Sequence, residues 1–511
     1  MIEVSNAWKD IQQRFLLPET YVEIDCVISE VGAQESATAS GTNETGFSQV
    51  DSILDDTPKT VKYATNELNF WALDGTRTIL PDSGSYATEG YVSNVESTGS
   101  VTLSFPEIRT AASSGVTITW GSAYGEYPSV FTVSATNGNT IVAQTTITNN
   151  TQQVSAVFLQ LQNYNKITIT VHDWGLPNRR VRIEKVVIGH VLTLTKKDIL
   201  SFTHEQHGDL LSGELPKYSI EFTLDNSDGR WDPNNPTGME QYLSERQKLT
   251  VRYGLDVNGT IEWIKAGTFY LSGWNTPSNG LEARFVARDG FEFLIGIEWW
   301  SALTSAMSYM VTNVTQNLWP SGSSVSYDSS LVDYMIDYTP SYTDGIVNTP
   351  AEIVQKCANA ACAILKCDRE SNLSIEPLNK EVTDYTIPLA LSYSYPEITL
   401  SKPLKDVSVD YGGENSYLLS VAQSGERQTL TNEFIATETN AQTVAKWVRD
   451  VLKPRKTVSG EFRADPRLDL YDIVKVEDRY GKLLTVAITN IKYTYNGSFR
   501  GSYTGRVLEE G

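Results

Sequence analysis

The feature that most constrains this chain is a succession of short runs in which apolar and polar residues alternate. Between residues 90 and 189 these runs include YVSNV, VTLSF, VTITW, FTVSAT, IVAQTTIT, VSAVFLQL and KITITV, with turn-forming residues between them. A period of two turns one face of each run towards a core and the other towards solvent, as in an antiparallel sheet. The spacing therefore predicts a β-sandwich or jelly roll over this stretch.

A second β-rich block covers residues 191–295, with runs such as YSIEFTLDN, LTVRYGL and EWIKAGTFYLSGW. Its turns carry Asp-Gly or Asn-Gly pairs, at Asp228-Gly229, Asn258-Gly259 and Asn279-Gly280. Both residues of such a pair tolerate the positive φ of a tight hairpin turn. The block is therefore predicted to consist of antiparallel hairpins.

Helical patterns interrupt the strands in three places. Residues 5–16 have apolar side chains at near-helical spacing and predict a short amphipathic arm, which an alternating strand follows from residue 21. Residues 350–366 start with a proline, suited to the first turn of a helix, and continue with apolar residues at helical spacing. A strand is predicted directly afterwards, in NLSIEPL. Residues 439–453 predict a third helix within a β-rich C-terminal stretch.

The length of the chain implies several domains, because single hydrophobic cores stop growing well below 511 residues. Residues 33–60 are small and polar and have no apolar period, which predicts a loop with a domain boundary. The predicted fold class is mainly β, multidomain and of α+β type.

Charge and targeting signals narrow the classes of function. The net charge is -21, so nucleic acid as the main ligand is disfavoured by long-range repulsion. The first residues lack the basic start and apolar run of a signal peptide, and no window approaches the roughly 20 apolar residues that span a bilayer. We expect synthesis in a cytoplasm and any later location through assembly or lysis.

Cysteines and histidines give no metal signature. Cys357, Cys362 and Cys367 are spaced by five, and five residues on a helix rotate by about 140°, so the three would not converge on one ion. With Cys26 they are expected to be free thiols. The pair in HEQH, residues 204–207, lacks the spacing of a zinc-protease helix and has a β context.

The segment DNSDGRWDPNNPTG, from Asp225 to Gly238, is dense in oxygen ligands. Its acids do not follow the alternation of an EF-hand, and no glutamate stands at the twelfth position. A hydrogen-bonded turn is the favoured interpretation, with ion binding left open. We expect neither a bound metal nor a cofactor.

Catalytic motifs are absent from the sequence. It contains no GxSxG, no P-loop, no GxGxxG after a strand and no Cys-His nucleophile signature. Two carboxylates at glycosidase spacing are expected by chance among 62 acidic residues. We therefore predict no catalytic residues and no enzymatic activity.

Four aromatic residues in the predicted sandwich are candidates for glycan contact, because sugar rings stack on aromatic faces. They are Trp120, Tyr124, Tyr127 and Trp174. The alternative for each of them is that it fills the sandwich core or its turns.

A family resemblance enters at residues 196–294. The DNSDGRWDPNNP turn, the strand ERQKLTVRYG and the hairpin GTFYLSGWNTP leading to ARDGFEFL come in one order, and this stretch resembles tail hub proteins of phages and prophages of Gram-positive bacteria. The upstream stretch is similar to the carbohydrate-binding-like insertion of those proteins. The C-terminal DPRLDLYDIVKV looks like a strand-turn-strand element of their second barrel, although Tyr471-Asp472 stands where Gly-Asp is more common.

The resemblance implies two tube-like β-barrels, an inserted jelly-roll-like β-sandwich and a small α/β segment. Its predicted domains are an N-terminal arm and first strand of barrel 1 (1–60), the inserted sandwich (61–190), the remainder of barrel 1 (191–295), the α/β segment (296–392) and the second barrel with an inserted helix (393–511).

The same resemblance implies a homotrimeric baseplate hub at the tail tip of a virion. Its partners would be the distal tail protein, the tail tube and tape measure proteins, and receptor-binding proteins, with DNA only in transit through the channel. Contact with a host surface glycan is a further expectation. Two alternatives remain open: a host cell-wall carbohydrate-binding adhesion protein and, with less support, a glycoside hydrolase.

Overall fold

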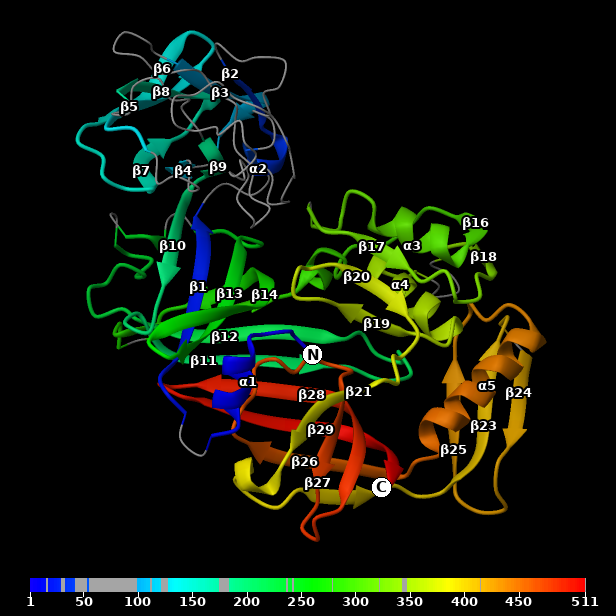
Figure 1. The fold of residues 1–511 in the computed structure, drawn as a ribbon. Coiled ribbons are helices and arrows are strands. Elements are labelled where there is room, and N and C mark those ends of the chain that lie inside the picture. The colour runs from blue at the N-terminus through cyan, green and yellow to red at the C-terminus, as the bar shows by residue number, and fades with distance from the viewer. Residues whose placement is uncertain are drawn as a thin grey trace, which may run out of the picture. The chain divides into compact units, whose positions relative to one another are not determined.

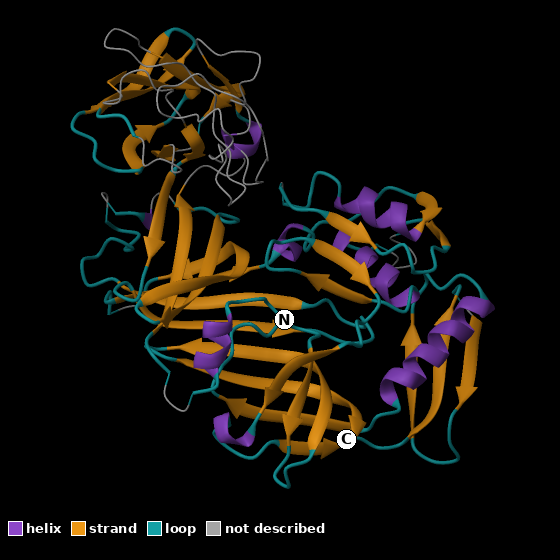
Figure 2. Cartoon of the chain, in the orientation of Figure 1, coloured by secondary structure: helices purple, strands orange, loops and turns teal. Residues whose placement is uncertain are grey.

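The computed structural model describes residues 1–14, 17–28, 33–41, 53–54, 99–110, 113–120, 127–173, 183–235, 238–240, 243–277, 279–320, 322–341, 347–413 and 415–510. The chain divides into two compact units. Unit 1 comprises Met1–Ile24, Leu194–Gly229 and Lys248–Gly511, and unit 2 comprises Asp25–Thr193 and Arg230–Gln247. Strands are the main element of both units (Figures 1 and 2), so the mainly β class is confirmed.

Within its described residues, unit 2 contains two antiparallel sheets and one short α-helix, α2 (Ala33–Ser36). The first sheet has five strands in the order β2 (Thr38–Gly41), β3 (Gly99–Arg109), β8 (Tyr164–Asp173), β5 (Val130–Asn137) and β6 (Thr140–Ile147). The second has three strands in the order β7 (Val154–Leu161), β4 (Ser113–Trp120) and β9 (Ile183–Ile188).

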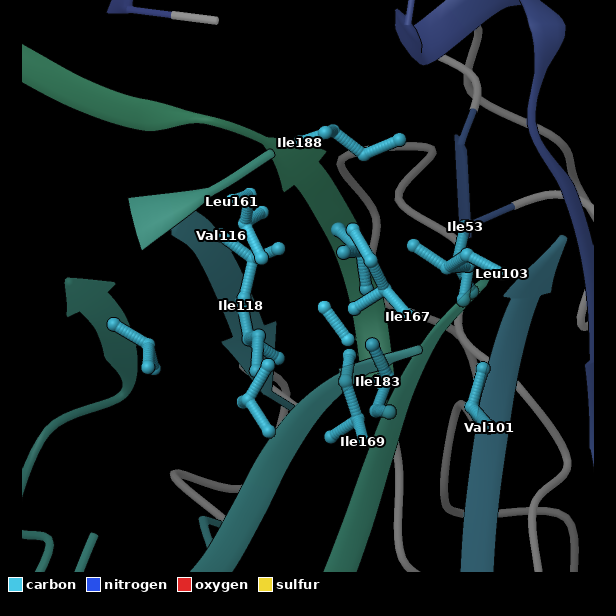
Figure 3. Close-up of a cluster of buried hydrophobic side chains, with 14 of the residues drawn as sticks. Ile53, Val101, Leu103, Val116, Ile118, Leu161, Ile167, Ile169, Ile183 and Ile188 are labelled. Atoms are coloured by element: carbon cyan, nitrogen blue, oxygen red, sulfur yellow. The ribbon is translucent and has the colours of Figure 1, made fainter. Parts of the chain in front are cut away.

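The two sheets of unit 2 share one hydrophobic core. Val101 and Leu103 of β3 and Ile167 and Ile169 of β8 belong to the same buried cluster as apolar side chains of β4, β7 and β9 (Figure 3). Burial alternates along β3 and β5 because successive side chains of a strand point to opposite faces. Unit 2 is thus a two-layer arrangement of sheets, as the sequence pattern predicts for its strands.

One long sheet provides the main strands of unit 1. Its strand order is β10 (His190–Leu194), β1 (Thr20–Ile28), β13 (Lys248–Val257), β14 (Thr260–Asn275), β15 (Glu282–Arg288), β12 (Lys217–Asp225), β11 (Ile199–His207), β28 (Leu483–Tyr495), β29 (Phe499–Glu510), β26 (Lys456–Phe462) and β22 (Glu397–Leu400). The strands β1 and β10 include the residues at which the chain passes between the two units. A branch adds β27 (Ile473–Glu477) and β21 (Val382–Ile387). Among the described residues this path of paired strands is open and does not return on itself as a closed barrel.

The N-terminal and C-terminal halves of this sheet meet where β11 pairs with β28. The pairing is antiparallel, from Phe202 opposite Tyr495 to His207 opposite Asn490. The same edge of β28 pairs with β27 at its other end, from Ile473 opposite Ala487 onwards. One edge of β28 is therefore shared between β11, which is distant in the sequence, and β27. The backbone hydrogen bonds between β28 and β11 join the two halves of the sheet.

Smaller elements complete unit 1. The helix α1 (Asn6–Gln12) precedes β1, and short turns of 3₁₀-helix form η4 (Gly290–Phe293) and η5 (Leu389–Leu391). The segment between the halves contains β16 (Leu303–Ala306), α3 (Met307–Thr315), β17 (Val325–Tyr327), β18 (Met335–Tyr338), α4 (Pro350–Ala360), β19 (Ile364–Cys367) and β20 (Leu373–Glu376). Near the C-terminus, α5 (Glu438–Leu452) covers a sheet of β24 (Asn415–Ser420), β23 (Leu404–Tyr411) and β25 (Glu426–Thr431) (Figure 1).

Two expectations from the sequence need correction. The helix predicted over residues 350–366 ends at Ala360, because the chain turns at Cys362, where φ is +59°, and continues as β19. The stretch 33–60, predicted to be a loop, contains α2 and β2 within its described residues. The helices predicted over residues 5–16 and 439–453 are present as α1 and α5, whereas α3 was not predicted. The hairpin at Asn258-Gly259 has the positive φ expected of it, +56° and +88°.

The start of α4 generates a stability prediction. Thr349 Oγ1 accepts from the Glu352 backbone N–H at 3.2 Å, and the Glu352 carboxylate accepts from the Thr349 backbone N–H at 2.7 Å. Removing this capping box with Thr349→Ala should lower the free energy of unfolding by about 1 kcal/mol. Chemical denaturation measures the change, with Thr349→Ser, which keeps the hydroxyl, expected to stay near the wild type.

Candidate functional site

A buried polar cluster lies in unit 1 beside the β11–β28 pairing. It gathers His204 and Gln206 from β11, Arg369 from the turn between β19 and β20, and Asp469 from the loop before β27. These side chains come from three segments far apart in the sequence. The cluster therefore forms only when the two halves and the α/β segment are assembled.

Arg369 is the centre of the cluster, and its side chain is only 7% exposed. Its Nε donates to both carboxylate oxygens of Asp469, at 3.1 and 3.0 Å. One terminal nitrogen donates to the carbonyl of Lys265 at 2.8 Å, and the other to the carbonyls of Pro466 and Leu468 at 2.9 and 3.1 Å. The planar guanidinium thus links β14 and the 466–469 loop to the α/β segment through five hydrogen bonds. A lysine ammonium has only three N–H donors and could not make all of them.

The charges of this pair are held in place by their mutual attraction. Burial alone would raise the pKa of Asp469, but the Arg369 charge and the Gln206 hydrogen bond hold that pKa below its ordinary value. Burial opposes the charge of Arg369 in the same way, and the Asp469 carboxylate outweighs it, so the pKa of the guanidinium is raised. Both groups are ionised across the whole physiological range.

His204 is a neutral member of the cluster. Burial, aided by the nearby Arg369 charge, lowers its pKa to about 3. Its Nδ1 lies 2.7 Å from the Tyr253 hydroxyl, and its Nε2 lies 3.4 Å from the Gln206 side-chain nitrogen. Because Gln206 also donates to Asp469, the amide nitrogen faces His204 as a donor, which places the imidazole proton on Nδ1.

The turn before β27 contains a residue in an unusual conformation. Tyr471 has a φ of +68°, in the left-handed region that favours glycine. Its backbone N–H donates to the carbonyl of Ile488 at 2.9 Å, and its hydroxyl donates to the carbonyl of Asp209 at 3.4 Å. A Cβ on Gly208 would stand 2.2 Å from the Tyr471 hydroxyl oxygen. The glycine expected from the resemblance at residue 471 is thus replaced by a strained tyrosine, and a glycine on the facing segment leaves room for its ring.

A small cavity adjoins the cluster. It measures about 20 Å³, room for about one water molecule, and is lined among others by Tyr218, Asp289 and Cys367. The Tyr218 hydroxyl and Asp289 Oδ2 are buried without a hydrogen-bond partner in the structure. Burial raises the pKa of Asp289 to about 8, although its other oxygen accepts from the Phe291 backbone N–H at 3.1 Å. Asp289 is therefore largely a neutral acid at physiological pH.

The cluster has a structural role, and we call its residues His204, Gln206, Arg369 and Asp469 the clasp. Arg369 is engaged by carbonyl and carboxylate oxygens, and burial raises the pKa of the Cys367 thiol well above its ordinary value, which leaves it a poor nucleophile. Among the described residues no three His, Cys, Asp or Glu side chains are grouped so that they could hold a metal ion. No helix of the described chain is long and apolar enough to cross a membrane.

The residues singled out as metal-like in the sequence are kept apart. His204 and His207 lie three apart on β11 and so face opposite sides of the strand, and His207 lies near Asn490. All four cysteines are free thiols, and Cys357 and Cys367 lie on a helix and a strand.

The 225–238 segment begins as a hydrogen-bonded turn, the interpretation favoured by its sequence. Asp225 accepts from the Ser227 backbone N–H at 2.9 Å, and the Gly229 N–H donates to the Asn226 carbonyl. Asp232 accepts in the same way from the Asn234 N–H at 2.8 Å. Ion binding at this segment stays untested.

The aromatic candidates for glycan contact do not form one surface among the described residues. Trp120 is fully buried, with its indole N–H donating to Ser155 and its ring 5.1 Å from that of Phe131. It therefore fills the core, and a sugar has no access to its face. Tyr127 is half-buried and packs against the same core. Tyr124 and Trp174 lie outside the described residues.

No pattern in the sequence pointed directly to this cluster. Arg369 and Asp469 are 100 residues apart, and neither belongs to a motif. The one available hint was the segment DPRLDLYDIVKV, which contains Asp469 and was singled out for its strands rather than for its charge.

Comparisons with known proteins give partial likenesses of structure. No family model matches the sequence, and no curated protein does. The 43 kDa tail protein of prophage MuSo2 from Shewanella oneidensis is similar, with 14% identity, 62% of this chain and 95% of that chain covered, and a TM-score of 0.44. The tail protein from Neisseria meningitidis MC58 has 10% identity, 63% and 94% coverage and a TM-score of 0.45. Prophage tail protein gp18 from Listeria monocytogenes EGD-e has 11% identity, 62% and 92% coverage and a TM-score of 0.41. These values are too low to assign the chain to a family.

The clasp generates a prediction about stability. Arg369→Met should destabilise unit 1 by about 3–5 kcal/mol, because it leaves the Asp469 carboxylate buried without its counter-charge. The double variant Arg369→Met/Asp469→Leu should recover part of that loss, since no charge remains to be desolvated. Chemical denaturation of both variants measures this, and a double variant as unstable as the single one would contradict an electrostatic cause.

Asp289 generates a prediction about pH. Because its pKa is raised on folding, from the ordinary value of 3.8 to about 8, its contribution to stability is complete below about pH 4 and is lost as the pH rises to about 8. Asp289→Asn keeps an oxygen for the Phe291 N–H and removes the titration. The variant should gain stability relative to the wild type by up to about 1.4 kcal/mol per pH unit across this window.

The measurement is chemical denaturation at pH 5 and pH 8. The titration of His204 is common to both proteins, so the difference between them isolates the Asp289 carboxyl. An equal pH dependence of wild type and variant would show that Asp289 is ionised in the folded protein.

Proposed function

We propose that the chain is a structural hub-like subunit at the tip of a phage-type tail. In this role it continues the tail tube and anchors distal tail and receptor-binding proteins, and it carries out no catalysis. Its location would be the tail tip of a virion. The proposal begins from the sequence resemblance of residues 196–294 to tail hub proteins, a stretch that forms β11 to β15 and η4 in the structure.

The observation that carries the proposal is the edge-to-edge pairing of two β-rich halves in one chain. In the strand order of the sheet, β11 is the last strand of the half that bears the resemblance. The strand next to it, β28, is the first of the C-terminal half, which also contains the hub-like DPRLDLYDIVKV. We propose that these halves, which form one open sheet among the described residues, take the place of the two tube-like barrels that the resemblance implies. The Arg369 clasp fixes the two halves to each other, as a load-carrying ring subunit requires.

The expected assembly is a homotrimer. Two similar β halves per chain in a ring of three present six comparable edges, which suits a hexameric tail tube. The partners proposed on this basis are the tail tube and tape measure proteins, the distal tail protein and receptor-binding proteins.

The charge of the chain suits a channel through which DNA passes. With a net charge of -21, a lumen lined by this protein would repel phosphate and let DNA slide without binding. DNA is accordingly proposed as a molecule in transit and not as a ligand.

A second candidate function is host adhesion through a glycan. Unit 2 is a compact β unit of its own, in the part of the chain whose sequence resembles a carbohydrate-binding-like insertion. Such a unit could contact host cell-wall carbohydrate either within a hub or as an independent adhesion protein. A glycoside hydrolase is the least supported alternative, since the residues gathered at the clasp serve packing.

The oligomeric state tests the hub. Light scattering of the purified protein should give three times the mass of one chain, and electron micrographs of the same sample should show rings with an open centre. The control is the same measurement at raised ionic strength. A specific ring should persist there, whereas an association through exposed charges alone should be weakened by the salt. A monomer at all concentrations that still binds wall polysaccharide would contradict the hub and favour the adhesion protein.

A further inference from the structure

Two residues that line the small cavity beside the clasp carry buried polar atoms with no hydrogen bond from any described residue. The atoms are the hydroxyl oxygen of Tyr218, on β12, and Oδ2 of Asp289, the residue before η4. Tyr218 is only 8% exposed and Asp289 only 4%. A buried polar atom without a partner carries the full cost of its desolvation, and folded proteins rarely leave one in that state.

The two residues are neighbours through the backbone. The Asp289 N–H donates to the carbonyl of Tyr218 at 3.1 Å, directly beyond the pairing of Ser219 with Arg288 that joins β12 to β15. Both side chains therefore start from adjacent points of the sheet and line one cavity. Gln206 and Asp469 of the clasp line the same cavity.

The size and the lining of the cavity determine what it can hold. Its volume is about 20 Å³, above the roughly 10–15 Å³ that one water molecule needs and too small for a larger ligand. Volume alone does not decide, because much larger cavities stay dry when their walls are apolar. Here the polar atoms of Tyr218 and Asp289 make the walls suitable for water.

We infer that this cavity binds one internal water molecule, which joins Tyr218 and Asp289 to the clasp. The Tyr218 hydroxyl can donate or accept, and the protonated oxygen of a neutral Asp289 carboxyl can donate. The Asp469 carboxylate and the Gln206 side-chain oxygen have lone pairs that can accept from the water. The lining thus offers four partners, and an internal water is typically held by about three.

The charges around the cavity favour water over a metal ion. Burial raises the pKa of Asp289 to about 8, so this carboxyl is mostly uncharged at physiological pH. The Asp469 carboxylate is engaged by Arg369, whose positive charge also lines the cavity together with that of Lys366. Two cations at the walls would repel a third in the cavity.

The water bridge would connect parts of the chain that the Arg369 hydrogen bonds do not. Arg369 links β14 and the 466–469 loop to the α/β segment, whereas the bridge extends from β12 and η4 to Asp469 in that loop. It therefore adds a contact between the two halves of unit 1. The inference concerns unit 1 alone and is independent of the ring proposed above.

The sign of the stability change in Tyr218→Phe tests the inference. With a bound water the Tyr218 hydroxyl is satisfied, so its removal costs a hydrogen bond and the folding equilibrium constant should fall about fivefold. Without a water the variant removes an unsatisfied buried hydroxyl, and the constant should rise. Chemical denaturation of the full chain at about pH 6, below the pKa of Asp289, measures the change. A rise overturns the inference.

The matched control is Thr383→Val on β21. The Thr383 hydroxyl oxygen is also buried without a partner among the described residues, but Thr383 does not line this cavity. Its folding equilibrium constant should stay unchanged or rise. A fall equal to that of Tyr218→Phe would assign both effects to the loss of a hydroxyl as such and overturn the inference.

A high-resolution crystal structure of the full chain gives the direct test. We expect one density peak at about 2.7–3.2 Å from both the Tyr218 hydroxyl and Asp289 Oδ2. A direct hydrogen bond between these two side chains, with no peak in the cavity, overturns the inference. Crystals grown with a rubidium salt in place of sodium provide the remaining arm, because an anomalous peak in the cavity would assign the site to a monovalent cation and also overturn it.

Discussion

The architecture of unit 1 depends on supplying partners to one buried charged side chain, that of Arg369. Arg369 is buried at the meeting point of three segments, and an uncompensated guanidinium there would cost several kcal/mol. The Asp469 carboxylate and three backbone carbonyls must therefore be present together, and they come from β14 and the loop before β27. Correct assembly of the halves satisfies all of these groups, and partial assembly satisfies few. The Arg369 contacts thus favour the correct pairing of β11 with β28 over pairings that would leave these buried groups without partners.

Local pattern was sufficient for much of the fold. Period-two alternation predicted the strands of both units, and Thr349, Pro350 and Glu352 marked the start of α4. The end of that helix was missed, because Ile364 and Leu365 continue the apolar spacing while belonging to β19. Periodicity alone does not distinguish a buried strand from a further helical turn over so few residues. The helix ends at Cys362, where φ is positive. A glycine or asparagine would have indicated this conformation in the sequence, but a cysteine does not.

The sites were less accessible to sequence reasoning, for two physical reasons. The clasp consists of contacts about 100 residues apart, and spacing along the chain carries no information about them. Trp120 belongs to the opposite case, because a tryptophan on an alternating strand fits a core and a ligand surface equally well, and only the packing around Phe131 decided for the core.

The place at which residues between β1 and β10 enter the chain has an evolutionary consequence. β1 and β10 are neighbours in the strand order, so the polypeptide leaves the sheet after one strand and returns to it in the strand alongside. Lengthening the intervening sequence adds little entropy cost, since each doubling of a flexible loop costs only about 0.6 kcal/mol more. Recombination could exchange that stretch for another module and leave the pairing of β11 with β28 unchanged. The stretch between β1 and β10 and the sheet that carries it can then diversify at different rates within one gene.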